Sequence, residues 1–225
     1  FVAMIALFLL PQIVWESQRD LTHSVLATTL SVATLYLMLR LISNGKTLEY
    51  VLFGVCAAAG LMSKYNYAVF LAALVLAGLT MPQGRAALLN WRTATSLGVM
   101  LLLLLPHVSW MLTHHDALLS SSHKLKAAVE GGLLKAWLEG LVSLGLSVVA
   151  FAGTLVVIAL LLFGRAGALS ECSPDSKSGR VLIGRCLLIG LLLCLAMVFC
   201  FHAHFKQRWM QPLLFATPLY FTLLV

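Results

Sequence analysis

Charged residues are scarce in this chain of 225 residues: Asp, Glu, Lys and Arg make up 10%, whereas hydrophobic residues make up 61%. A soluble domain keeps about a quarter of its residues charged, so this scarcity argues against a soluble globular protein. Within a bilayer the backbone polar groups must be satisfied internally, which leaves helices or closed barrels. The long apolar runs lack the alternation of barrel strands. The sequence therefore predicts an all-α polytopic membrane protein.

Several familiar signatures are also missing. The five cysteines form no CxxC pair and four lie inside apolar runs, which argues against a disulfide framework or a zinc site. The chain has no phosphate-binding loop, dinucleotide fingerprint, hydrolase elbow, kinase signature, haem pattern or iron–sulfur pattern. No basic stripe with interleaved aromatics stands clear of the apolar runs, so we expect no nucleic-acid partner. The net charge of +7 is better explained by basic residues that meet the headgroups of membrane lipids.

The apolar residues fall into separate segments, and spanning a bilayer takes about 20 of them. We expect about eight transmembrane helices within a single transmembrane domain over residues 1–225. Their expected ranges are 1–15, 21–42, 49–63, 65–81, 93–113, 137–164, 182–202 and 210–225. The first and last ranges are cut, and neither an initiating Met nor a basic leader precedes Phe1. We therefore expect a piece of a longer protein, truncated at both ends.

Lys64 interrupts an apolar stretch that is too long for one span. A straight helix over 49–81 would overshoot the bilayer. Two short helices that meet at 63–67 fit better, because a lysine at the bilayer centre costs a few kcal/mol or more unless it is paired. At a hairpin tip the Lys64 ammonium reaches water or an anion. Tyr65 and Tyr67 suit the membrane interface.

Two of the polar breaks are long. Residues 165–181 are mostly small and polar, which predicts a flexible inner loop. Residues 121–136 carry apolar side chains every four positions beside lysines, which predicts an amphipathic helix in the membrane interface. Gly131 and Gly132 weaken that helix.

The histidines are distributed unevenly. Successive breaks must alternate between the two membrane faces, and all seven histidines lie in or beside breaks of one face. Lys64 belongs to the same face. Groups that titrate, bind metals or hold phosphate make this face the candidate active face. Lysines and arginines are divided almost equally, so charge alone does not set the orientation.

Asp20 and the histidines after the fifth segment are candidates for chemistry. Asp20 either faces a cavity or simply favours the start of a helix. His107 and Trp110 share one helix face. The candidates for a divalent metal site are His107, His114, His115 and Asp116, although the adjacent histidines point to different helix faces.

Lys206 and Arg208 are the last candidates for chemistry. With His202 and His204 they form a cationic mouth. Alone it is typical of an interfacial anchor. Opposite Lys64 and Asp20 it could serve as an anion cradle.

Four groups of residues together resemble a known family. They are Pro11 with Asp20, the run Gly60-Leu61-Met62-Ser63-Lys64-Tyr65, Pro106 to Trp110 with His115-Asp116, and Phe205-Lys206-Gln207-Arg208-Trp209 with Pro212. In this order the chain resembles the membrane domain of bacterial C-type glycosyltransferases. The branch is that of protein mannosyltransferases and of enzymes that add aminoarabinose or galacturonic acid to lipopolysaccharide.

The resemblance implies a glycosyltransferase of the bacterial inner membrane, with its active face extracytoplasmic. A sugar would pass, with inversion, from a polyprenyl-phosphate donor to a lipid, glycan or protein acceptor. Asp20 would match the second acidic position, while the general base would lie before Phe1, so this piece alone would not complete catalysis. The expected substrate-binding residues are Lys64, Tyr65, Trp110, Lys206 and Arg208. Some relatives bind a divalent metal through a histidine, so a metal cofactor is possible.

Two other functions fit the same residues. A transporter or flippase for an anionic lipid-linked sugar would use the basic mouth without chemistry, but its polar groups usually lie near the midplane. A membrane anchor without a ligand would leave the histidine distribution unexplained.

Overall fold

The computed structural model describes residues 23–114, 132–163 and 174–223, and their regular elements are helices, as expected. Asp20, the segment 1–15 and residues 115–131 lie outside the described residues. The elements are α3 (His23–Asn44), α4 (Thr47–Ser63), α5 (Tyr67–Leu79), α6 (Pro82–Leu88), α7 (Thr93–Thr113), α9 (Leu133–Phe163), α10 (Pro174–Phe201), η1 (Gln207–Trp209), α11 (Gln211–Leu214) and α12 (Thr217–Thr222).

Four described helices contain stretches long and apolar enough to cross a membrane: His23–Asn44, Thr93–Thr113, Leu133–Gly153 and Lys177–Phe201. A fifth crossing results if α5 and α6, which meet at 115°, count as one bent span. Helix α4 is apolar but shorter. The expected total of eight therefore stays a prediction.

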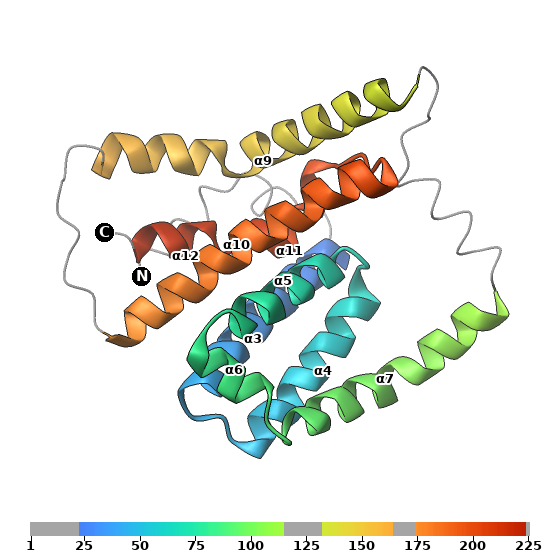
Figure 1. The fold of residues 1–225 in the computed structure, drawn as a ribbon, viewed down its shortest axis with the longest axis vertical. Coiled ribbons are helices and arrows are strands. Elements are labelled where there is room, and N and C mark those ends of the chain that lie inside the picture. Colours follow the sequence, from blue (N-terminus) through green and yellow to red (C-terminus); the bar gives the residue numbers. More distant parts are fainter. Residues whose placement is uncertain (1–22, 115–131, 164–173, 224–225) are drawn as a thin grey trace.

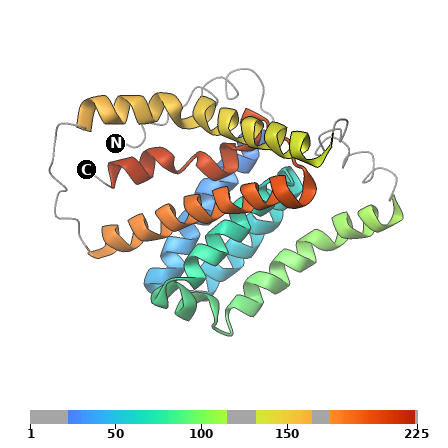
Figure 2. The ribbon, with the colours of Figure 1, turned by 45° about the horizontal axis from the view of Figure 1, so that its top comes forward.

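Helices α3, α4 and α5 form the centre of the bundle, with α10 packed against α5 and α7 packed against α4 (Figure 1). Helix α9 runs along the outer side of α10 (Figure 2). The core joins Met38 of α3, Phe70 and Leu74 of α5, and Ile183 and Val198 of α10, each at most 1% exposed. Buried apolar side chains from all three helices thus fix their relative positions.

The hairpin between α4 and α5 forms as expected, with Lys64 extended between the two helices. Tyr67, however, does not lie at the interface. It is 0% exposed, and its hydroxyl lies 2.6 Å from Thr34 Oγ1, because a buried phenol needs a partner. Gly60 makes this possible, since a Cβ there would overlap the Tyr67 ring.

Three expected segment boundaries were wrong. Helix α10 begins at Pro174, so the loop expected over 165–181 ends by residue 173; proline suits a first helical turn because it has no N–H to leave unpaired. The interfacial helix expected over 121–136 does not continue to 136, because Gly132 has φ +94° and Leu133 starts α9.

The third wrong expectation is the transmembrane span over 210–225. Residues 207–222 instead form η1, α11 and α12, with prolines in the first turns of α11 and α12. Pro212 and Pro218 cannot donate the backbone hydrogen bonds that a continuous helix requires.

The two ends of the bundle differ. We call the end where α3 and α5 finish and α4, α7 and α10 begin the arginine-capped end. There Arg92 Nη1 donates to Gly45 O (2.9 Å) after α3, and Arg185 Nη1 donates to Thr80 O (2.8 Å) after α5. Cations at helix C-termini satisfy unpaired carbonyls and complement the helix dipole.

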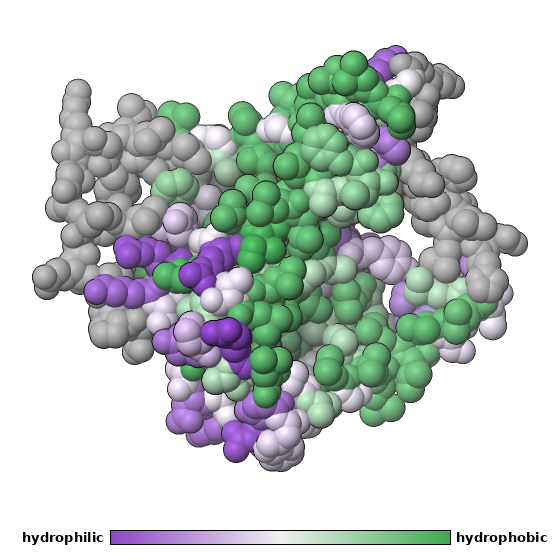
Figure 3. All heavy atoms as spheres, in the orientation of Figure 1, coloured by the Kyte–Doolittle hydropathy of each residue, from purple (hydrophilic) through white to green (hydrophobic). Residues whose placement is uncertain are grey.

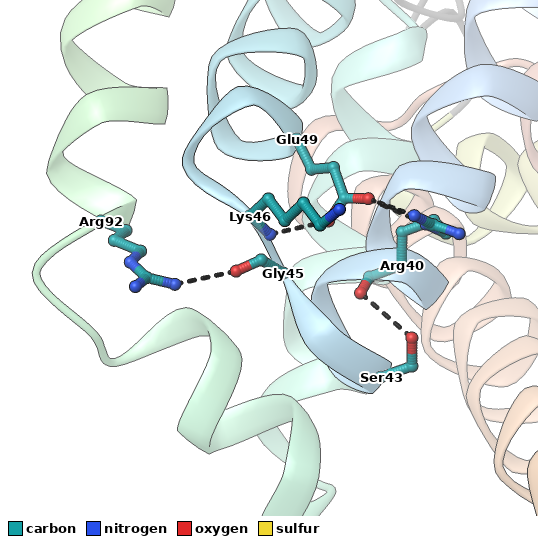
Figure 4. A network of polar contacts seen from close by, with 6 residues as sticks. All are labelled: Arg40, Ser43, Gly45, Lys46, Glu49 and Arg92. Carbon is teal, nitrogen blue, oxygen red and sulfur yellow. Dashed lines mark hydrogen bonds and ion pairs between the residues drawn. The ribbon is translucent and has the colours of Figure 1, made fainter.

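Glu49 completes this end (Figure 4). Its carboxylate accepts from the Lys46 backbone N–H (2.8 Å), as in a capping box, and from Arg40 Nε (2.8 Å). Figure 3 shows hydrophilic side chains gathered at the lower left, towards this end, while apolar side chains cover the middle of the molecule.

Candidate functional site

The opposite end of the bundle, which we call the pocket end, carries a hollow of about 510 Å³. It lies where the α4–α5 hairpin meets the start of α3 and the η1 turn. The lining residues are His23, Ser24, Met62, Ser63, Lys64, Tyr65, Arg208 and Trp209. Three segments that are far apart in the sequence therefore build one cavity.

Lys64 connects these three segments. Its Nζ donates to Ser24 Oγ at 2.7 Å and to Arg208 O at 3.1 Å. The extended backbone of Lys64, between two helices, turns the side chain into the hollow instead of along a helix surface. The ammonium is thereby held at the wall of the hollow by a hydroxyl and a carbonyl.

The end of α10 delivers Arg208 to this place. His202 stops the helix with φ 53°, a left-handed conformation, and its N–H still bonds Val198 O at 3.0 Å. The chain then turns back, and Phe205 N donates to Ser143 Oγ of α9 (3.0 Å). Asn66 Nδ2 donates to Trp209 O at 2.5 Å, so the hairpin holds the η1 turn directly.

The described part of the lining carries basic side chains. Arg208 is exposed, and its guanidinium has no hydrogen-bond or ion-pair partner among the described residues. Among the described residues, the lining contains Lys64, Arg208 and His23 but no Asp or Glu. A ligand with a phosphate or carboxylate group suits such a site, because guanidinium and ammonium donors form charge-assisted hydrogen bonds with anions.

A row of rings leads from the hollow along α7. The Tyr65 hydroxyl lies 3.3 Å from His107 Nε2, and the ring of His107 lies nearly parallel to that of Trp110 (16°, centroids 6.5 Å apart). Trp110 in turn stacks on His114 at 4.8 Å. Trp110 is not among the residues that line the hollow, and it is connected to the hollow through His107 and Tyr65.

The expected metal site finds no support in this part of the chain. Residues 23–114, 132–163 and 174–223 contain no group of three His, Cys, Asp or Glu that could hold a metal ion. His107 contacts Tyr65, and His114 Nδ1 lies 3.0 Å from Trp110 O. His115 and Asp116 lie outside the described residues, so a metal ion stays a prediction.

The structure brings three of the expected substrate-binding residues together: Lys64, Tyr65 and Arg208. Lys206 is exposed and does not line the hollow, and Asp20 lies outside the described residues. Sequence reasoning missed four participants: His23, Ser24, Asn66 and Trp209. Asn66 lies in the break at 63–67, and Trp209 lies in the run that contains Lys206 and Arg208. Nothing in the sequence pairs Ser24 with Lys64.

An apolar helical bundle with a cationic hollow at one end defines a membrane protein suited to an anionic ligand. Residues 1–110 match the family model described as dolichyl-phosphate-mannose-protein mannosyltransferase. Two curated relatives from Rhizobium johnstonii are lipopolysaccharide core galacturonosyltransferases. RgtB is 31% identical over 99% of this chain and 45% of its own length, and RgtA is 30% identical over 98% and 44%.

These matches support the bacterial C-type glycosyltransferase family that the sequence resembles. It spans less than half the length of these two curated relatives. No solved structure matches the chain.

Proposed function

We propose that this chain forms the donor-binding part of an integral-membrane glycosyltransferase. The donor is a sugar linked to a polyprenyl phosphate, and its phosphate occupies the hollow between Lys64 and Arg208. One observation carries the proposal: two cationic side chains 144 positions apart line a single cavity. The glycosyltransferase family that the comparisons support points to the same chemistry.

The reaction requires positive charge at the phosphate. The acceptor oxygen forms a bond to the anomeric carbon, and the bond from that carbon to the phosphate oxygen breaks with its electron pair. The hydroxyl proton passes to a base, and Asp20 is the acidic residue of this chain that we propose for the site. Lys64 and Arg208 stabilise the departing phosphate, which is electrostatic catalysis by preorganised donors.

The acceptor and the membrane face follow from the same proposal. The relatives act on the lipopolysaccharide core, so we infer a glycan acceptor of the cell envelope and galacturonic acid as the sugar. For such an acceptor we propose that the pocket end faces the extracytoplasmic side of the inner membrane. A lipid-linked donor also explains why basic residues occur on a face that usually has few of them.

The test uses Lys64→Met in the protein at its natural length, reconstituted in nanodiscs. Transfer of labelled galacturonic acid from its polyprenyl phosphate to lipopolysaccharide core is measured. Loss of a preorganised donor to a developing oxyanion costs about 10²–10³ in rate, which is the expected loss here. Lys46→Met, at the arginine-capped end, is the matched control and keeps full transfer.

The outcomes separate the alternatives. Equal transfer by Lys64→Met and wild type overturns the assignment of Lys64. Binding of the donor without transfer to any acceptor supports a flippase or transporter of anionic lipid-linked sugars. Absence of both binding and transfer in the wild type overturns the proposed function.

A further inference from the structure

Trp209 is the part of the hollow whose presence an anion site alone does not explain. It lines the cavity beside Arg208 and is partly buried. Its backbone N–H donates to Lys206 O (2.8 Å), and its backbone carbonyl accepts from Asn66 Nδ2 (2.5 Å). A phosphate group would need the neighbouring cations but gains nothing from an indole ring held in place in this way.

The support behind Trp209 is rigid. Its ring meets Phe205 edge to face, with centroids 6.5 Å apart and an interplanar angle of 79°. Phe205 is 7% exposed, and its backbone bonds both Ser143 Oγ (3.0 Å) and Ser147 Oγ (3.4 Å) of α9. The ring is therefore positioned before any ligand arrives, which reduces the entropic cost of binding.

Asn66 holds the Trp209 backbone at a cost. Its Oδ1 is buried and has no hydrogen-bond partner among the described residues. Leaving a buried acceptor unpaired costs about 1–3 kcal/mol. A small apolar residue would avoid that cost but would release the Trp209 carbonyl, so the position favours placement of the turn over local stability.

A pyranose ring supplies the chemistry that this wall fits. One face of the sugar presents C–H groups that pack on an aromatic ring, while its edges carry hydroxyls. A sugar joined to a phosphate combines such a face with an anion a few bonds away. Ligand sites typically pair apolar or aromatic walls with a few placed polar groups. The hollow offers both next to each other, with Trp209 adjacent to Arg208.

We propose that Trp209 is the wall on which the sugar ring of the donor packs, and that Asn66 is its positioning residue. The inference rests on the proposed function and adds the part of the site that recognises the sugar. Lys64 and Arg208 bind the phosphate whether or not a sugar is attached. The two halves of the site are thus separable by comparing a sugar-linked carrier with a sugar-free one.

The test measures the affinity of the protein at its natural length, in nanodiscs, for three probes. They are a polyprenyl phosphate, the same lipid carrying galacturonic acid, and the same lipid carrying mannose. In the wild type at least one sugar-linked form binds more tightly than the free carrier. Trp209→Leu reduces that advantage by about tenfold, the order expected for an aromatic contact of about 1.4 kcal/mol, and leaves affinity for the free carrier within twofold.

Trp209→Phe keeps part of the advantage, because it preserves an aromatic ring. Asn66→Ala lowers affinity for the sugar-linked form more than affinity for the free carrier, a ratio that a general loss of folding would not change. Matched controls are Trp91→Leu, which removes an exposed tryptophan far from the hollow, and Asn90→Ala, which removes the amide that bonds Tyr50. Both controls keep the wild-type ratio.

Failure of this inference is distinct from failure of the proposed function. Unchanged discrimination in Trp209→Leu, or an equal loss of affinity for all three probes, overturns the role of Trp209. Equal binding of all three probes by the wild type also overturns it while leaving the phosphate site intact. If the wild type binds none of the probes, the proposed function itself is wrong.

Discussion

The two ends of the helical bundle use the same residue type in opposite ways. At the arginine-capped end, Arg40, Arg92 and Arg185 bond a carboxylate or the carbonyls that follow helices. At the pocket end, the Arg208 guanidinium has no partner among the described residues, and Lys64 Nζ donates to Ser24 Oγ and Arg208 O at the wall of the hollow. The first arrangement stabilises the fold, and the second leaves the Arg208 guanidinium available to a ligand in the part of the chain that the structure describes. Composition alone would treat these residues as equivalent.

Substituting one arginine at each end gives the sharpest test of this difference. Arg208→Gln should lower sugar transfer by about 100-fold, the scale of losing one preorganised donor, with little change in thermal stability. Arg185→Gln should lower stability by about 1 kcal/mol, because Thr80 loses its hydrogen bonds, with transfer per folded molecule unchanged. Transfer assays and thermal unfolding in nanodiscs measure both quantities. A stability loss in Arg208→Gln that matches its activity loss would remove the distinction.

Gly60→Ala tests whether the pocket end depends on the packing beneath it. The added methyl group overlaps the Tyr67 ring and should cost about 1–3 kcal/mol, the usual cost of overpacking. Displaced Tyr67 also loses Thr34 and shifts the Lys64 hairpin, so transfer should fall together with stability. Gly98→Ala is the control, because a Cβ there meets nothing within 4 Å. Wild-type stability in Gly60→Ala would show that the hairpin tolerates a displaced ring.

Glu49→Gln tests the arginine-capped end alone. The amide oxygen still accepts from Lys46 N–H, but the ion pair with Arg40 is lost. Because Arg40 is half exposed, we expect a loss of only about 1 kcal/mol, seen as a lower unfolding temperature. That loss should shrink in high salt, and transfer should not change. A fall in transfer without destabilisation would mean that the two ends are coupled.

His202→Gly should have the smallest effect. Glycine adopts the φ of 53° without strain, but it loses more entropy on folding, so a net stabilisation of about 0.5 kcal/mol is expected. His202→Val should destabilise instead, because a β-branched residue is an outlier at positive φ. Thermal unfolding distinguishes the two variants. Equal stability of both would show that the end of α10 does not impose this conformation.

Helix positions in the centre of the chain could be predicted well, because length and apolar composition decide them. The helix expected over 93–113 matches α7, and the interruption at Lys64 predicted a hairpin from the cost of burying an ammonium. Prediction failed where single residues with special backbone behaviour decide: Pro174 starts a helix early, and Pro212 and Pro218 divide the last segment. Gly132, with its positive φ, interrupts the helix that was expected over 121–136.

The site could be predicted only in part. Lys64, Tyr65 and Arg208 stand out as polar residues between apolar runs, so their membrane face follows from counting segments. Ser24 and Asn66 do not stand out, because their roles are hydrogen bonds to residues 40 and 143 positions away. Such pairings arise from how α3, α5 and the η1 turn meet, and no local pattern records them. Tyr67 was misplaced for the same reason, since its partner Thr34 belongs to another helix.

The bond from Lys64 to Arg208 sets an order of assembly during synthesis. The two residues are 144 positions apart, so at about 5–20 residues per second roughly 7–30 s of translation separate them. For that interval the first helices lie in the membrane before the turn that completes the hollow has left the ribosome. The donor that we propose has no complete cavity to bind before that point, because α10 must first be inserted and the chain must turn back to η1.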